Sequence, residues 1–157
     1  MNFEMHIAKS SRHAKIAGDF GEMLVLYWLS KYGFECAKVD HTGIDLIARN
    51  PNTKERMGIS VKCRTRDVGT EMDSVAIKKK DFDKIGNACE AFGCTPYLAM
   101  VVDAGKTIRI FITPIKHFLE TYAGSGWKMS DGYLTRYAKD SEVMVFELNT
   151  ETKRWWG

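Results

Sequence analysis

The feature that most constrains this chain is a pair of strand-like segments that carry charges where buried strands normally carry apolar residues. The segments cover residues 44–49 and 57–63, and the turn-rich sequence NPNTKE separates them. We predict an antiparallel hairpin in which Asp45 lies opposite Ser60, with Lys62 as its diagonal neighbour. Because side chains alternate between the faces of a strand, a carboxylate, a hydroxyl and an ammonium group then share one face.

The periodicity of the remaining sequence surrounds this hairpin with further elements. Helical spacing of apolar residues predicts helices over residues 14–31 and 80–92 and a short helix over 117–122. Gly33 and Gly93 end the first two helices. Further strands are predicted over residues 34–39, 97–102, 107–112 and 143–148. This order predicts an α/β fold, with a mixed sheet and helices packed on its faces.

Length and composition favour one globular domain over residues 1–157, since 45% of the 157 residues are hydrophobic. Lys and Arg number 23 against 20 Asp and Glu, a net charge of +3 that permits nucleic-acid binding. The four cysteines form no CxxC pair, which argues against a zinc site and favours reduced thiols in the cytoplasm. No run approaches the roughly 20 apolar residues that a membrane span requires, so we expect no membrane partner.

The first helix contains the sequence GDFGE, with two glycines that each cost about 1 kcal/mol relative to alanine. One interpretation is that a strand or a phosphate backbone approaches Gly18 closely, beside Glu22, which lies four residues further on the same helix face. The other is that the glycines relieve crowding between helix and sheet, and that Glu22 is a solvated surface residue.

The run GDFGEMLVLYWLSKYGFECAKVDHTGIDLIARNPNTKERMGISVKCR, followed by DFDKIGNACEAFG and TPYLAMVV, resembles the PD-(D/E)xK nucleases. Among them it is most similar to the archaeal Holliday-junction resolvases and related small endonucleases. The resemblance covers roughly residues 14–113, which leaves residues 114–157 as a C-terminal extension. It implies a restriction-endonuclease-like fold, in which a mixed β-sheet is flanked by α-helices.

The resemblance also implies an active site and an activity. Its catalytic residues would be Glu22, Asp45, Ser60 and Lys62, and Mg²⁺ or Mn²⁺ would be held by Glu22, Asp45 and the backbone carbonyl of Val61. The implied activity is the hydrolysis of phosphodiester bonds in double-stranded or branched DNA by a homodimeric endonuclease. Lys62 would orient the attacking water or stabilise charge on the phosphate.

Ser60 departs from this pattern, because the family has an acid two residues before the lysine. Either Glu71 or Asp73 supplies the missing carboxylate, or both are solvated loop residues. Alternatively the chain has lost catalysis and remains a DNA-binding or scaffolding protein of the same fold. A third interpretation is a protein-binding module in which Asp45 and Lys62 form a structural ion pair.

Basic residues next to the hairpin are the candidates for contacts with nucleic acid. They are Arg64, Arg66, Lys78 and Lys79. Cations beside a carboxylate site would contact phosphates and supply affinity that does not depend on sequence. The aromatic residues near the C-terminus are candidates for base stacking, or for packing against the sheet or a dimer partner. They are Trp127, Tyr133, Tyr137, Trp155 and Trp156.

Overall fold

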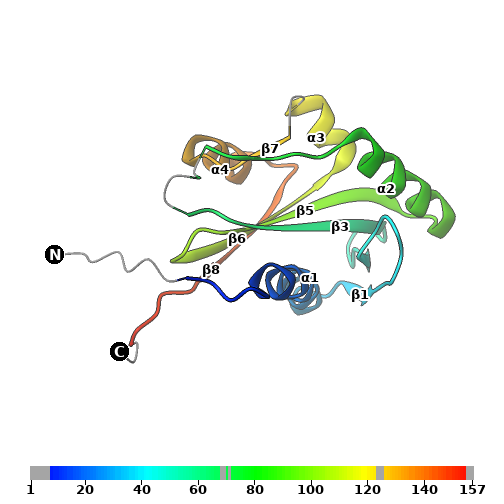
Figure 1. Ribbon diagram of the computed structural model, residues 1–157. Helices are drawn as coiled ribbons and strands as arrows, with labels where there is room; N and C mark the ends of the chain where they lie inside the picture. Colours follow the sequence, from blue (N-terminus) through cyan, green and yellow to red (C-terminus); the bar gives the residue numbers. More distant parts are fainter. Residues whose placement is uncertain (1–7, 68–69, 71, 123–125, 155–157) are drawn as a thin grey trace.

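A six-stranded mixed sheet forms the centre of the molecule (Figure 1). The structure is a computed structural model that describes residues 8–67, 70, 72–122 and 126–154. The strands are, in their spatial order, β1 (Glu35–Lys38), β2 (Leu46–Arg49), β3 (Arg56–Thr65), β5 (Thr95–Asp103), β6 (Thr107–Pro114) and β8 (Met144–Asn149). Only β3 and β5 run parallel. The predicted α/β fold with a mixed sheet is confirmed.

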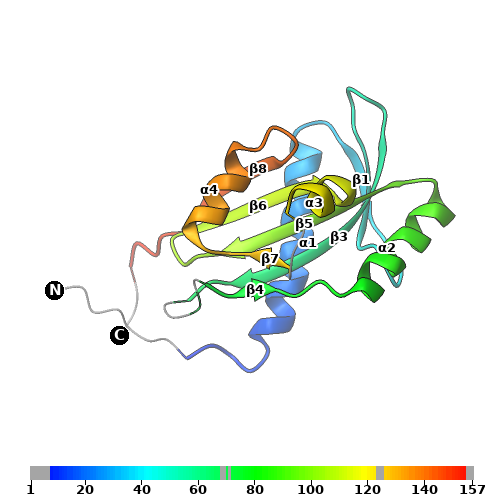
Figure 2. The same ribbon diagram turned by 90° about the horizontal axis from the view of Figure 1, so that it is seen from above.

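Helices cover both faces of this sheet. The long helix α1 (His13–Lys31) lies on one face, and α2 (Lys79–Phe92), α3 (Ile115–Thr121) and α4 (Asp131–Lys139) lie on the other (Figures 1 and 2). A short second sheet pairs β4 (Ser74–Val75) with β7 (Trp127–Lys128). None of the helices in the described ranges is long and apolar enough to cross a membrane.

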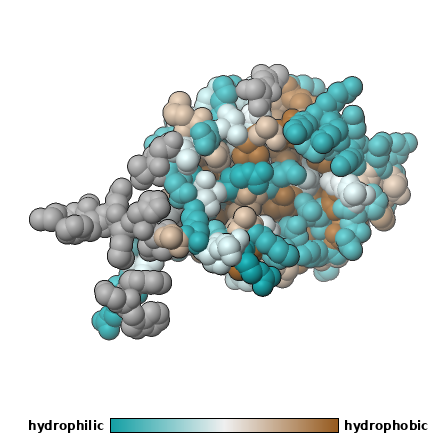
Figure 3. Space-filling model, in the orientation of Figure 1, coloured by the Kyte–Doolittle hydropathy of each residue, from teal (hydrophilic) through white to brown (hydrophobic). Residues whose placement is uncertain are grey.

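The hairpin has the register that its turn length predicts. Leu46 pairs with Ile59, and continuing this register by one residue places Asp45 opposite Ser60. The Asp45 N–H donates a hydrogen bond to the Ile59 carbonyl at 2.8 Å. Strand β3 runs on to Thr65, beyond the end of this ladder. Within the described residues, its last six positions pair with β5 alone. One edge of β3 is therefore open. In Figure 3, brown apolar surface lies in the region of this edge, with teal hydrophilic surface on either side of it.

Helix α1 packs on the sheet through Gly21, Leu24, Val25 and Leu29. A Cβ atom on Gly21 would lie 2.9 Å from the Cβ of Cys63 on β3, whereas one on Gly18 would meet nothing within 4 Å. The crowding between helix and sheet therefore explains Gly21 and leaves Gly18 without a structural reason.

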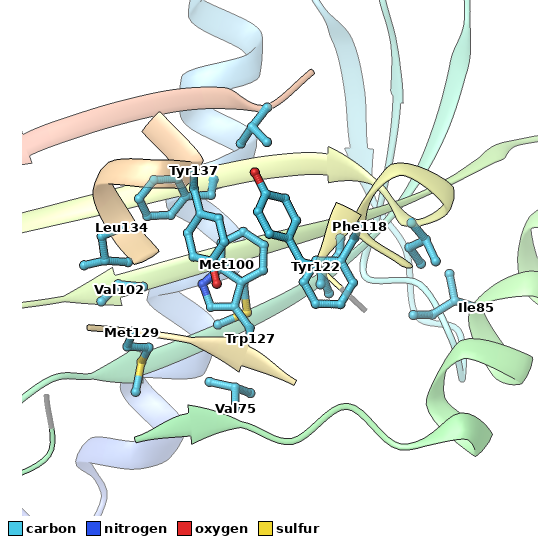
Figure 4. Close-up of a cluster of buried hydrophobic side chains, with 14 of the residues drawn as sticks. Val75, Ile85, Met100, Val102, Phe118, Tyr122, Trp127, Met129, Leu134 and Tyr137 are labelled. Atoms are coloured by element: carbon cyan, nitrogen blue, oxygen red, sulfur yellow. The ribbon is translucent and has the colours of Figure 1, made fainter. Parts of the chain in front are cut away.

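Aromatic side chains fill the space between the sheet and the helices α3 and α4 (Figure 4). Trp127 is completely buried, its ring lies 4.0 Å from that of Tyr137, and it stacks on Phe118 at 5.4 Å. Packing, not base stacking, accounts for Trp127 and Tyr137. Trp155 and Trp156 lie outside the described residues.

Candidate active site at the hairpin

Asp45 accepts two backbone hydrogen bonds at the point where the hydrogen-bonded ladder between β2 and β3 ends. Its carboxylate accepts the backbone N–H of Val61 at 2.7 Å, and its carbonyl accepts the N–H of Val39 at 2.9 Å. Burial raises the pKa of this carboxyl group most, and Glu22 raises it further; the Val61 N–H and the Lys62 ammonium lower it without cancelling the rise. The net effect is a half-buried acid whose pKa is raised above its usual value.

Ser60 and Lys62 lie with Asp45 on one cavity of about 240 Å³. Its lining residues are Thr42, Gly43, Asp45, Ser60, Val61, Lys62, Asp81, Lys84 and Ile85. The predicted convergence of a carboxylate, a hydroxyl and an ammonium group is therefore present. Ser60 is only 5% exposed. Among the ion pairs of the described residues, none joins Asp45 to Lys62, so the pair does not act as a simple structural salt bridge.

Glu22 approaches the same carboxylate from α1. Its side chain is 22% exposed and forms an ion pair with Lys38 on β1, with 3.0 Å between Nζ and Oε2. Its charge contributes to the raised pKa of Asp45, so the two acids are electrostatic neighbours. The structure thus brings Glu22 and Asp45 together from two elements, with Lys38 as the cation that now neutralises Glu22.

Val61 contributes backbone groups to the open edge of β3. Along a strand, the N–H and C=O of one residue point to the same side, so the Val61 carbonyl faces the edge on which Asp45 binds its N–H. Two carboxylates and a carbonyl are oxygen donors of the kind that Mg²⁺ prefers. Within the described ranges, however, no three His, Cys, Asp or Glu side chains are grouped closely enough to hold a metal ion by themselves. Waters and a phosphate oxygen would have to complete such a site.

Asp81 and Lys84 line the cavity and were not predicted as site residues. They reach it because α2 packs closely against the hairpin: a Cβ on Gly43 would lie 2.4 Å from the Lys84 carbonyl oxygen, and one on Gly58 would lie 2.5 Å from the Cys89 Sγ. Asp81 Oδ2 also accepts the Lys78 N–H at 3.0 Å, as part of the helix cap. Asp81, Lys84 and Ile85 are spaced three and four residues apart, so the sequence could have predicted that they share one face of α2.

The other acids and bases that the sequence singled out lie elsewhere. Asp73 is exposed and does not line the cavity, and Glu71 lies outside the described residues. Arg64 is exposed at the end of β3, and Lys78 and Lys79 are exposed at the start of α2.

Arg66 has a different environment from these exposed cations. Its side chain is only 14% exposed and forms an ion pair with Asp131 at 2.6 Å. Its Nη1 also donates to the Met129 carbonyl at 3.4 Å, so its guanidinium ties the chain after β3 to the start of α4.

Comparisons with known proteins give structural similarity without sequence similarity. No family model matches the chain, and no curated protein matches it. Among solved structures, Hjc, a Holliday junction resolvase from Archaeoglobus fulgidus, is 17% identical with a TM-score of 0.54, over 76% of this chain and 93% of that one. A restriction endonuclease in complex with substrate DNA is 15% identical with a TM-score of 0.41, over 94% of this chain and 76% of that one. The sheet order, the flanking helices and the match to Hjc together show that this chain has the restriction-endonuclease-like fold.

Proposed function

We propose that this chain is a divalent-metal-dependent endonuclease that hydrolyses phosphodiester bonds in DNA. The observation that carries the proposal is the placement of Asp45, Ser60 and Lys62 on one cavity beside the open edge of β3. The fold supports it, because Hjc, a solved structure of similar fold, is a Holliday junction resolvase.

Glu22, Asp45 and the Val61 carbonyl are the groups that would hold Mg²⁺ or Mn²⁺. Two neighbouring carboxylates repel each other, and the charge of Glu22 is one cause of the raised pKa of the half-buried Asp45. A divalent cation would relieve it, taking over from the Lys38 ammonium that now pairs with Glu22. When bound, such an ion lowers the pKa of a water ligand and polarises the scissile phosphate.

Lys62 and Asp81 would complete the chemistry from the walls of the cavity. Lys62 is a half-buried residue on the cavity wall, and its ammonium group would orient the attacking water or stabilise charge on the phosphate oxygens. Ser60 is neutral, and Asp81 is the described carboxylate that shares the cavity with Asp45. We infer that Asp81 supplies the acid that the serine lacks, through a bound water and not as a direct partner of Asp45.

DNA would contact the exposed cations at the two ends of this region. Arg64 extends from β3, while Lys78, Lys79 and Lys84 lie along the first turns of α2. Such contacts make binding strongly salt-dependent and independent of sequence. Arg66, which forms an ion pair with Asp131, would act by holding the end of β3 against the start of α4. Every group in this scheme comes from one copy of the chain.

Cleavage of labelled four-way junction, duplex and single-stranded DNA with Mg²⁺ or Mn²⁺ tests the proposal. The decisive variant is Asp45→Asn, because the amide oxygen can still accept the Val61 N–H while the charge is lost. The matched control is Asp40→Asn, an exposed acid nearby. We expect metal-dependent cutting that disappears in Asp45→Asn and persists in the control.

Two results would contradict this scheme. Full cutting by Asp45→Asn would remove Asp45 from the chemistry. DNA binding by the native chain without cleavage of any of these DNAs would instead support a nuclease-fold protein that binds DNA without catalysis.

A further inference from the structure

A second cavity lies between the helices α3 and α4, which sit together on one face of the sheet (Figure 2). Its volume of about 580 Å³ exceeds that of the hairpin cavity, about 240 Å³, and the two share no lining residue. Small-molecule sites typically have volumes of about 300–1,000 Å³. The lining residues are His117, Thr121, Tyr122, Gly132, Thr135, Arg136, Lys139 and Asp140.

Asp140 is the one acid among these lining residues, and groups of the chain already use its carboxylate. Oδ2 accepts hydrogen bonds from His117 Nε2, at 2.7 Å, and from the Tyr122 hydroxyl, and Oδ1 accepts the Glu142 N–H at 2.9 Å. Burial acts to raise the pKa of Asp140, but the hydrogen bonds from His117, Tyr122 and the Glu142 backbone hold it below 3.8. The carboxylate therefore fixes the frame of the cavity and is not the partner of its cations.

Arg136 and Lys139 are cations on the cavity wall that face no acid partner. None of the ion pairs between described residues includes either of them. The Arg136 guanidinium lies over the Tyr122 ring, 4.8 Å from Cζ to the ring centroid, and its Nη2 donates to the Thr121 carbonyl at 3.5 Å. Arginine has several N–H donors in a fixed fork, so these contacts orient the group and leave donors for a ligand.

The α4 wall is bare beside these cations. Gly132, Thr135, Arg136 and Lys139 follow one another at intervals of three, one and three residues, so they share one helix face. A Cβ atom on Gly132 would meet nothing within 4 Å. Packing against the rest of the protein therefore does not require a glycine there, and its missing side chain widens the cavity.

We propose that this cavity binds a phosphate monoester, at a site separate from the hairpin. The Arg136 fork matches a phosphate group, on which it can form two parallel hydrogen bonds, and Lys139 adds a point charge. A phosphate monoester carries about −1.5 to −2 charges at pH 7, which two cations balance better than they would a single carboxylate. The space beside Gly132 would take the organic part of the ester. The monoester has two sources, a free nucleotide or the terminal phosphate of a DNA strand.

Isothermal titration of the whole chain with adenosine monophosphate, in EDTA so that no divalent metal takes part, tests this proposal. We expect binding that adenosine, which lacks the phosphate, does not reproduce. Arg136→Gln and Lys139→Met should each weaken it at least tenfold, about 1.4 kcal/mol or more. The matched control is Lys116→Met, which removes an equal charge from an exposed position of α3 that does not line the cavity.

Gly132→Leu tests the cavity itself without removing a charge. The new side chain starts in open space, so the variant should keep the melting temperature of the native chain and lose at least tenfold in affinity. Circular dichroism and melting curves identify any variant that fails to fold, and the remaining variants then decide.

Competition with short DNA strands distinguishes the two sources. Displacement by a strand with a terminal phosphate, and not by the same strand with a terminal hydroxyl, supports a strand end as the ligand. Binding of the mononucleotide that neither strand displaces supports a free nucleotide. Equal displacement by both strands would overturn the preference for a monoester.

The proposal is also overturned if adenosine monophosphate does not bind at about 10 mM, a limit that corresponds to roughly 2.7 kcal/mol. Binding that the folded Arg136→Gln, Lys139→Met and Gly132→Leu chains all retain, or that Lys116→Met weakens equally, has the same meaning. Cleavage at the hairpin can succeed or fail in any of these cases, because the two cavities have no residue in common.

Discussion

The Asp45 carboxylate accepts the backbone N–H of Val61 at 2.7 Å, at the position where the β2–β3 ladder stops. A side-chain oxygen thus takes the place of the backbone carbonyl that a longer β2 would have supplied. This substitution keeps the Val61 backbone ordered and leaves the edge beyond it accessible. The same hydrogen bond fixes the acid that we place at the centre of the chemistry.

Asp45→Asn should raise thermal stability at pH 7 when no divalent metal is present. The pKa of Asp45 is raised above its ordinary 3.8, so the folded state binds its proton more tightly than the unfolded state does. Stability is therefore lost as the pH rises through the window between 3.8 and the folded pKa, and the loss is complete above it. We expect the variant to melt about 2 °C or more above the native chain. The advantage should vanish below pH 3.8, and equal melting temperatures at pH 7 would contradict it.

Lys62→Met should abolish most cleavage while leaving the fold and DNA binding intact. Methionine preserves the length of the half-buried side chain and removes the charge that would act on the phosphate. Loss of one such electrostatic group costs roughly 100- to 1,000-fold in rate. Single-turnover cleavage and a binding titration measure the two properties separately. Lys54→Met, in the exposed hairpin turn, should match the native rate, and an equally active Lys62→Met would rule out this role.

Ser60→Asp should lower the stability of the metal-free chain and raise its affinity for a divalent metal. Ser60 is 5% exposed beside Asp45, so a new carboxylate there would be poorly solvated and would lower the melting temperature of the metal-free chain. We expect Mn²⁺ to restore that stability and to bind about tenfold more tightly, or ~1.4 kcal/mol. Isothermal titration with Mn²⁺ and melting curves measure both effects. Ser60→Ala should leave the Mn²⁺ affinity unchanged, and an unchanged affinity in Ser60→Asp would argue against a metal at this cavity.

Alanine at the two glycines of α1 should have opposite effects. Gly18→Ala meets open space and should stabilise the chain by up to ~1 kcal/mol through helix propensity. Gly21→Ala would place a Cβ 2.9 Å from the Cys63 Cβ, and such overpacking costs about 1–3 kcal/mol. Urea unfolding of both variants measures the difference. A stabilising Gly21→Ala would mean that β3 can move away from the helix.

The sequence was sufficient where local patterns decide structure. The hairpin register follows from its turn, and helix α2 ends at Gly93, whose φ of 65° favours glycine. The resemblance correctly implied the fold, and it placed Asp45, Ser60 and Lys62 on elements that the structure brings to one cavity. The metal, the catalytic roles and the contacts with DNA stay predictions.

Long-range packing determines the features of the site and of the fold that local sequence patterns did not predict. Asp81 faces the cavity because Gly43 admits the backbone of α2, a contact between residues some forty positions apart. Strands β4 and β7 have two residues each, too few for any periodicity, and helix α4 was also not predicted. Periodicity identified α1 but not which of its apolar residues would meet the sheet, and Ile16 and Tyr27 face outward.

The pairing of β8 with β6, and the packing of Trp127 and Tyr137 against Phe111 of β6, make the C-terminal segments part of the same folding unit as the hairpin. Residues beyond 113 therefore contribute a strand and buried aromatic side chains to the sheet that carries the hairpin. A fragment that ended there would expose the β6 edge and an uncovered apolar face, the two features that most promote aggregation. We therefore expect the region that the resemblance left as an extension to unfold together with the hairpin in a single transition.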